Sequence, residues 1–249
     1  MTWGSNVPLT RTPDAHFLTE VRYKGTKVVS VSPDYAESTT SSDAWLNVKA
    51  GTDAALAMAM GHVILKEYYI DKETPYFKEY AKEFTDMPFL VRVEDINGAV
   101  QPGRFLNAKD LGSKEDGADF QTVLIDETTN EIVVPNGTMG DRHTNPQKWN
   151  LRLENRNTGA KIDPRLSVFD QRQDVTVVKL PYFGDEEHEG VIERAIPTIT
   201  VQTVDGPVKV TTVYDLILAN YGIDRGIGGE VATSYTDDTP YTPTWQEKI

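Results

Sequence analysis

The sequence predicts an α/β protein: a partial doubly wound, Rossmann-like sheet that lacks its first strand, with a β-rich insertion. Three observations support this prediction. A loop with a glycine, Trp3-Gly4-Ser5-Asn6-Val7-Pro8, stands where such a sheet passes from a strand to a helix. A helical segment and a β-prone run then follow at the spacing of a strand–loop–helix–strand unit. Further along, short β-prone runs alternate with turn residues.

The first third of the chain predicts short strands alternating with helices. The expected elements are a helix over 13–23, strands over 27–31 and 44–48, and helices over 54–67 and 75–84. Pro13 suits the first position of the first helix, and Gly25 follows its end. Because the glycine loop begins two residues after Met1, the strand before it is expected to be missing, which would leave an open sheet edge and favour self-association.

The middle of the chain predicts antiparallel hairpins. Strands are expected over 89–93, 123–125, 132–134, 175–180, 198–204 and 208–212. Asn97-Gly98 and Asp205-Gly206 are strong turn signals. A helix is expected over 214–221, and Thr242-Pro243 marks another helix start.

These patterns predict three parts. They are a partial dinucleotide-binding α/β segment (1–87), a β-rich insertion (88–213) and a truncated return to the α/β domain (214–249).

Composition excludes several classes of function. The net charge of −13 counts against a general nucleic-acid-binding protein, which needs clustered Lys and Arg. The chain has no cysteine, so these residues form no disulfide, thiolate metal site or iron–sulfur ligand set. Neither a signal peptide nor a membrane-spanning run is visible, so direct membrane insertion is not expected.

The glycine loop is the first candidate binding element. Gly4 has no Cβ, so a phosphate could approach its backbone, and Ser5 and Asn6 offer short polar side chains. An ordinary strand-to-helix turn with a buried tryptophan explains the same residues, and for the loop alone it is the better explanation.

Two carboxylates follow at the ends of the next expected strands. An acidic residue such as Asp34 can reach ribose hydroxyls, and a carboxylate can accept both N–H groups on the Watson–Crick edge of guanine. Asp53 stands at a helix start, where capping is the simpler explanation, just as a Pro33-Asp34 turn explains Asp34. The conjunction of three sites on one sheet edge favours a nucleotide pocket.

The histidines offer weaker signals. His188 lies in an acidic run that could hold a metal but is more typical of a solvated loop. His16 and His62 fall within expected helices, which favours packing roles, and His143 has no partner pattern for a nucleophilic triad.

Longer strings carry a resemblance. They are Trp3–Phe17, Thr19–Lys27, Pro33–Glu37, Gly51–Ala55, Ala59–Val63, Thr85–Pro88, Pro135–Gly137, Lys148–Leu151, Pro181–Gly184, Thr211–Leu216 and Ala232–Tyr235. Together they resemble the catalytic α subunit of membrane-bound respiratory nitrate reductases, within the molybdopterin oxidoreductase superfamily. The likeness covers nearly the whole chain and is weaker over 101–121 and 155–178, so the chain resembles a central fragment of such a subunit.

This resemblance implies a cofactor, molybdenum bis(molybdopterin guanine dinucleotide), and residues that bind it. The first loop would contact pyrophosphate and ribose through Trp3, Gly4, Ser5, Asn6, Val7 and Thr10. The guanosine end would be enclosed by Ser32, Pro33, Asp34 and Tyr35 and by Gly51, Thr52 and Asp53. No catalytic residue or metal ligand is expected within these residues.

The resemblance also implies a larger enzyme. The ligands of its 4Fe-4S cluster and its molybdenum-ligating aspartate would lie upstream, so the fragment alone is expected to be inactive. The parent would reduce nitrate to nitrite with an iron–sulfur β subunit and a membrane-anchoring γ subunit, at the cytoplasmic face of the membrane. Two alternatives stay open: a structural or subunit-interaction segment, and a sibling enzyme acting on chlorate, perchlorate or selenate.

Overall fold

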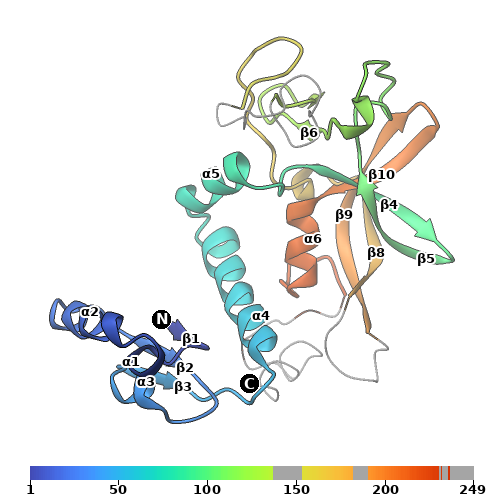
Figure 1. The fold of residues 1–249 in the computed structure, drawn as a ribbon. Helices are drawn as coiled ribbons and strands as arrows, with labels where there is room; N and C mark the ends of the chain where they lie inside the picture. The colour runs from blue at the N-terminus through green and yellow to red at the C-terminus, as the bar shows by residue number, and fades with distance from the viewer. Residues whose placement is uncertain (137–152, 182–189, 230, 232–234, 236–249) are drawn as a thin grey trace. The chain divides into compact units, whose positions relative to one another are not determined.

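The computed structural model describes residues 1–136, 153–181, 190–229, 231 and 235 (Figure 1). Contacts between residues divide the chain into two compact units, Met1–Met60 and Gly61–Tyr241. The expected helix start at Thr242 and the histidines His143 and His188 lie outside the described residues, as do the matching strings Lys148–Leu151, most of Pro181–Gly184 and most of Ala232–Tyr235.

The first unit is built on three short parallel strands. They are β1 (Thr2–Trp3), β2 (Val29–Val31) and β3 (Ala44–Leu46), and they lie in the order β1-β2-β3. Thr2 pairs with Ser30, and Ser30 pairs with Trp45. Helices α1 (Val7–Thr10), α2 (Thr12–Tyr23) and α3 (Glu37–Thr40) lie in the connections between the strands, which confirms the parallel α/β prediction.

One expectation for this unit is wrong. The strand before the glycine loop is not missing, because Thr2 and Trp3 pair in parallel with Ser30 and Val31. Two residues are too few to show the alternation that marks a strand in sequence. The edge of β2 that was expected to be open is therefore covered by β1.

The core of the first unit is small. Val31, Val48 and Leu56 are buried together, and the partly buried ring of Trp3 packs against them. Helix α2 contributes no buried residue. Side-chain hydrogen bonds therefore determine much of the conformation of the loops around this sheet.

The helices of the second unit form a core of their own. A long helix, α4 (Asp53–Ile64), begins in the first unit and continues as the π-helix η1 (Leu65–Asp71), and α5 (Pro75–Phe84) follows. Helix α6 (Val213–Asn220) also contributes to this core. The buried residues of the core are Leu65, Tyr69, Ala81, Leu166, Tyr214, Leu218 and Ile223. The bounds predicted for α5 are confirmed, and those for α6 differ by one residue at each end.

A five-stranded antiparallel sheet makes up the rest of this unit. Its order is β5 (Ala99–Phe105), β4 (Leu90–Ile96), β10 (Gly206–Thr212), β9 (Val191–Thr203) and β8 (Asp174–Pro181). The edge strands β5 and β8 approach each other, which curls the sheet into a half-barrel (Figure 1). Small elements beside it are β6 (Leu124–Ile125), β7 (Ile132–Val133) and the 3-10 turns η2 (Ala118–Phe120) and η3 (Phe169–Gln171).

Both predicted hairpins are confirmed. Asn97 and Gly98 join β4 to β5 with φ angles of 57° and 81°, as a tight hairpin turn requires. Thr203 pairs with Gly206 at the turn between β9 and β10. The sequence did not predict β5, in which Pro102 and Gly103 interrupt the β-prone pattern, or the first half of β9.

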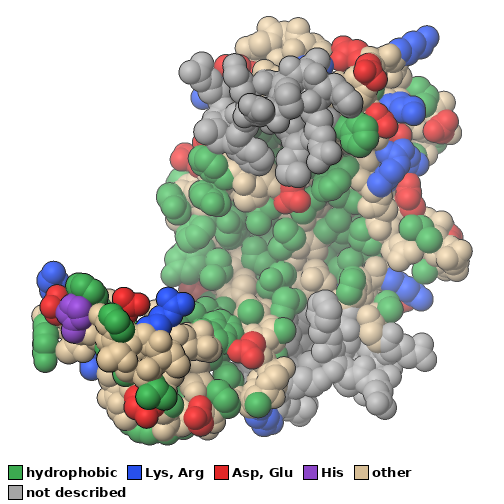
Figure 2. Space-filling model, in the orientation of Figure 1, with side chains coloured by type: hydrophobic (Ala, Val, Ile, Leu, Met, Phe, Trp, Pro, Cys, Tyr) green, Lys and Arg blue, Asp and Glu red, His purple; other side chains and the backbone are tan. Residues whose placement is uncertain are grey.

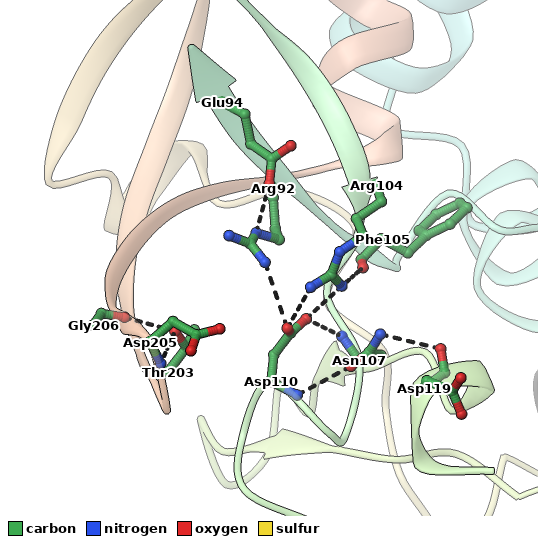
Figure 3. Close-up of polar contacts among 10 residues, drawn as sticks. All are labelled: Arg92, Glu94, Arg104, Phe105, Asn107, Asp110, Asp119, Thr203, Asp205 and Gly206. Atoms are coloured by element: carbon green, nitrogen blue, oxygen red, sulfur yellow. Dashed lines mark hydrogen bonds and ion pairs between the residues drawn. The ribbon is translucent and has the colours of Figure 1, made fainter. Parts of the chain in front are cut away.

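A buried carboxylate ties this sheet to the loop after β5 (Figure 3). Asp110 is 5% exposed and accepts hydrogen bonds from Arg104 at 2.7 and 2.5 Å and from the Asn107 N–H at 3.2 Å. Arg92, itself paired with Glu94, lies 3.4 Å from the same carboxylate. Burial raises the pKa of Asp110, but the Arg104 hydrogen bond and the other donors and charges outweigh it and hold that pKa below its usual range. The two arginines and the two carboxylates of this cluster balance in charge, so we assign it a structural role.

A second buried carboxylate, Asp215, anchors α6. Its oxygens accept from Arg225 at 2.5 Å and from Ser167 at 2.6 Å, and also from the Val168 N–H at 2.9 Å. Thr212 caps the helix by accepting from the Asp215 N–H at 3.1 Å and donates to the carboxylate at 2.9 Å. One carboxylate thus joins the start of α6 to Arg225, ten residues on, and to Ser167 and Val168, more than forty residues earlier.

Replacing that carboxylate should destabilise the chain. Asp215→Asn leaves the Arg225 guanidinium without its counter-charge where Arg225 is 10% exposed, so we expect a loss of about 3 kcal/mol in the free energy of unfolding. Urea titration followed by circular dichroism measures this loss. The exposed Asp170→Asn should change the same quantity by less than about 0.5 kcal/mol. Equal stability of the two variants would refute the anchoring role.

Candidate functional site

The carboxyl ends of β1, β2 and β3 meet at one edge of the first unit's sheet. Because the three strands are parallel neighbours, the loops that follow them emerge on the same side. These loops hold the residues that the sequence singled out, around Gly4, Asp34 and Asp53. Gly4, Asp34 and Asp53 are all exposed. The edge is therefore open to a ligand.

The first loop turns at Gly4, whose φ of +65° is a conformation that side chains disfavour. An added Cβ there would meet no atom within 4 Å, so the backbone at Gly4 borders open space. Ser5 is also exposed. Val7 and Thr10 belong to α1, and the Thr10 hydroxyl donates to the Asn6 carbonyl at 2.7 Å, closing the turn.

Contacts with α3 hold the Asn6 side chain. Its Nδ2 donates to Glu37 Oε2 at 2.6 Å. The hydroxyl of Ser38, which is 4% exposed, lies within hydrogen-bonding distance of two acceptors, the Ser5 carbonyl at 3.0 Å and Asn6 Oδ1 at 3.1 Å. The Asn6 hydrogen bond lowers the pKa of Glu37 below its ordinary value of 4.5, and the backbone N–H of Glu37 adds to the effect.

Sequence reasoning missed Glu37 and Ser38. No element was expected between the strands over 27–31 and 44–48, whereas residues 37–40 form a helical turn. A Glu-Ser pair after an Asp34-Tyr35-Ala36 turn is a weak helix-start signal, and no local pattern links it to Asn6.

The second loop is organised locally. The Ser32 hydroxyl donates to Asp34 Oδ1 at 2.7 Å, and the Trp45 indole donates to the Ser32 carbonyl at 2.9 Å. The ring of Tyr35 meets that of Trp45 edge-on, with centroids 5.2 Å apart. Pro33, Asp34 and Tyr35 are exposed. Asp34 therefore forms the turn contact of the simpler explanation and also faces solvent at the edge.

The third loop is tied directly to the first. Gly51 has a φ of +86°, and Thr52 Oγ1 donates to the Lys49 carbonyl at 2.7 Å just before α4. Asp53 Oδ1 accepts a hydrogen bond from the indole Nε1 of Trp3. The structure thus brings Trp3 and Asp53 together across fifty residues of sequence.

Other candidate chemistry falls away among the described residues. They contain no group of three or more His, Asp or Glu side chains placed to hold a metal ion. His62 is buried, its Nδ1 lies 2.7 Å from the Tyr221 carbonyl, and burial lowers its pKa, which agrees with a packing role. No helix in the described part of the chain is long and apolar enough to cross a bilayer.

Comparisons with known proteins identify the family of this chain. The model of the molybdopterin oxidoreductase family matches residues 1–217. The chain is 52% identical over its whole length to the nitrate reductase alpha chain of Bacillus subtilis, covering 20% of it. It is 47% identical over 99% of its length to the respiratory nitrate reductase 1 alpha chain of Escherichia coli, covering 21% of that protein. A perchlorate reductase subunit alpha of Dechloromonas aromatica is 40% identical over 56% of the chain, which covers 14% of that subunit.

The chain therefore spans about one fifth of the length of the curated nitrate reductase relatives that it matches.

The Asn6–Glu37 contact makes a pH-dependent prediction. Because the pKa of Glu37 is lowered in the folded chain, the contact stabilises the fold above the unfolded-state pKa and is lost as the pH falls through the folded value. We expect Asn6→Ala to raise the pKa of Glu37 toward 4.5, measured by NMR titration of the side-chain carboxyl carbon. Thr19→Ala, which removes a hydroxyl on α2, should leave it unchanged. An unmoved titration midpoint in Asn6→Ala would rule the contact out.

Proposed function

The chain belongs to the molybdopterin oxidoreductase family, and we propose that its first unit encloses part of one molybdopterin guanine dinucleotide in a respiratory nitrate reductase α chain. The observation that carries this proposal is the meeting of three exposed loops at one parallel sheet edge. In the full-length parent, the remaining strands of a complete doubly wound sheet would come from other parts of the chain.

The residues at this edge fit the chemistry of such a ligand. Trp3, Gly4, Ser5, Asn6, Val7 and Thr10 would border the pyrophosphate and ribose, with Gly4 offering backbone that no Cβ obstructs. Ser32, Pro33, Asp34 and Tyr35 and also Gly51, Thr52 and Asp53 would surround the guanosine.

The carboxylates suit guanine in particular. A carboxylate has about four lone-pair positions, so Asp53 can bind the Trp3 indole and still accept from a base. The indole N–H fixes the orientation of that carboxylate. Asp34 and Asp53 are the acceptors that we assign to the N–H groups of the guanosine end.

The parent enzyme would reduce nitrate to nitrite. When bound, the molybdenum centre supplies oxygen-atom transfer and the 4Fe-4S cluster supplies electrons, whereas this chain binds and orients the dinucleotide. With no cysteine in the chain, the cluster must be held by other residues, so we propose that the 249 residues alone have no nitrate reductase activity. We place the parent with an iron–sulfur β subunit and a membrane-anchoring γ subunit at the cytoplasmic face of the membrane.

Nitrate is favoured over related oxyanions by the extent of the likeness. The nitrate reductase relatives match the whole chain, whereas the perchlorate reductase relative matches 56% of it. A sibling enzyme that reduces perchlorate, chlorate or selenate is the alternative, and assays of the purified parent with each oxyanion distinguish them.

Removing the two carboxylates tests the pocket. In the full-length parent, we expect Asp34→Ala with Asp53→Ala to lower the GMP released by acid hydrolysis at least about tenfold, because two charge-assisted hydrogen bonds are lost. Nitrate reduction with a dye donor should fall in parallel. Asp14→Ala, an exposed change on α2, serves as the control. A wild-type GMP content in the double variant would refute the pocket assignment.

A second role, in assembly, is favoured by an exposed aromatic row on α5. Tyr76, Tyr80 and Phe84 are four residues apart and 69%, 48% and 44% exposed, and the rings of Tyr80 and Phe84 stack at 5.1 Å. Figure 2 shows hydrophobic side chains gathered over this part of the second unit. Such a row is typical of an interaction surface, so we propose that it packs against a neighbouring part of the parent complex.

Cross-linking tests that role. A photoreactive phenylalanine at position 80 should cross-link to another part of the α chain or to the β subunit in the intact complex. The same probe at the exposed neighbour Glu79 points about 100° away around the helix and should cross-link much less. Absence of any product from position 80 would count against the assembly role.

A further inference from the structure

The side chain of Asn6 is occupied by the protein at both of its polar ends. Its nitrogen donates to Glu37 and its oxygen accepts from Ser38, whose hydroxyl also reaches the Ser5 carbonyl. Glu37 and Ser38 are neighbours at the start of α3. Two adjacent residues of α3 therefore hold the glycine loop through the Asn6 side chain and the Ser5 carbonyl.

We propose that Glu37 and Ser38 form a brace that acts through Asn6 to set the shape of the first loop, and that Asn6 is a positioning residue. This inference rests on the proposed dinucleotide pocket and deepens it. It refines the assignment of the first loop: Gly4 and Ser5 face the ligand, whereas Asn6, although it borders the pocket, acts by holding them in place.

Electrostatics favours this division. The Asn6 nitrogen lies 2.6 Å from the carboxylate of Glu37. A phosphate bound at the same nitrogen would stand within a few ångströms of that negative charge, and like charges at such a distance repel. The backbone at Gly4 is exposed, and an added Cβ there would meet no atom within 4 Å, so Gly4 and the exposed Ser5 suit an anionic pyrophosphate better.

The small local core leaves much of the first loop to polar contacts. Among the described residues of this unit, Val31, Val48 and Leu56 form a small buried cluster, and the first loop meets it through the partly buried ring of Trp3. Ser38 is buried, so its hydroxyl needs an acceptor, which both the Ser5 carbonyl and Asn6 supply. The lowered pKa of Glu37 agrees with a carboxylate that is held in its charged form by this contact.

An exchange of the amide and the carboxylate tests the brace in the full-length parent. In Asn6→Asp, two carboxylates face each other, and we expect the GMP released per α chain to fall about tenfold. Glu37→Gln keeps an acceptor for Asn6 and should stay within about twofold of wild type. The double variant Asn6→Asp/Glu37→Gln restores one donor and one acceptor at unchanged net charge, so GMP should return to within about twofold of wild type.

The outcomes separate the brace from the pocket. If the double variant stays as low as Asn6→Asp, the Asn6 amide acts on the ligand directly and the brace is overturned, as it is if Asn6→Asp keeps full GMP. Asp53→Ala in the same series reports on the pocket independently, because it leaves the brace intact. If Asn6→Asp fails to fold by circular dichroism, Ser38→Ala replaces it and should lower GMP severalfold, with Glu20→Gln on α2 as the unchanged control. Wild-type GMP in Ser38→Ala would also overturn the brace.

Discussion

The parallel pairing of β1, β2 and β3 is the constraint on which the candidate site depends. Parallel neighbours send their following loops to one edge, so residues fifty positions apart come together without a large core. Trp3 couples this sheet to its edge. Its ring packs against Val31, Val48 and Leu56, while its indole N–H binds Asp53. One side chain therefore serves both the packing of the first unit and the orientation of a proposed ligand group.

The two units stabilise themselves by different means. The second unit has extended apolar clusters, and its buried carboxylates Asp110 and Asp215 are each matched by arginine and backbone donors. The first unit has a small core and relies on short polar contacts among its loops. Such contacts set the conformation of the loops at the binding edge while burying little apolar surface. The loops therefore gain little rigidity from these contacts alone. A bound dinucleotide and the remaining chain of the parent would add to its stability.

Much of the architecture was predictable because it is encoded locally. Helix α5 follows from apolar periodicity and its proline start, and the β4–β5 turn follows from Asn97-Gly98. The parts that failed depend on partners distant in sequence. Strand β1 exists only because it pairs with β2, and β5 forms despite Pro102 because β4 lies beside it. The Asn6–Glu37 contact crosses thirty-one positions with no local signal, so the sequence identified the loop but not what holds it.

The most direct measurement is an experimental structure of the intact parent with its cofactor bound. We expect the guanine to lie within hydrogen-bonding distance of Asp34 and Asp53, and the pyrophosphate to lie against the backbone of Gly4 and Ser5. A dinucleotide bound away from the carboxyl ends of the three parallel strands, with these loops facing solvent or another domain, would contradict this expectation.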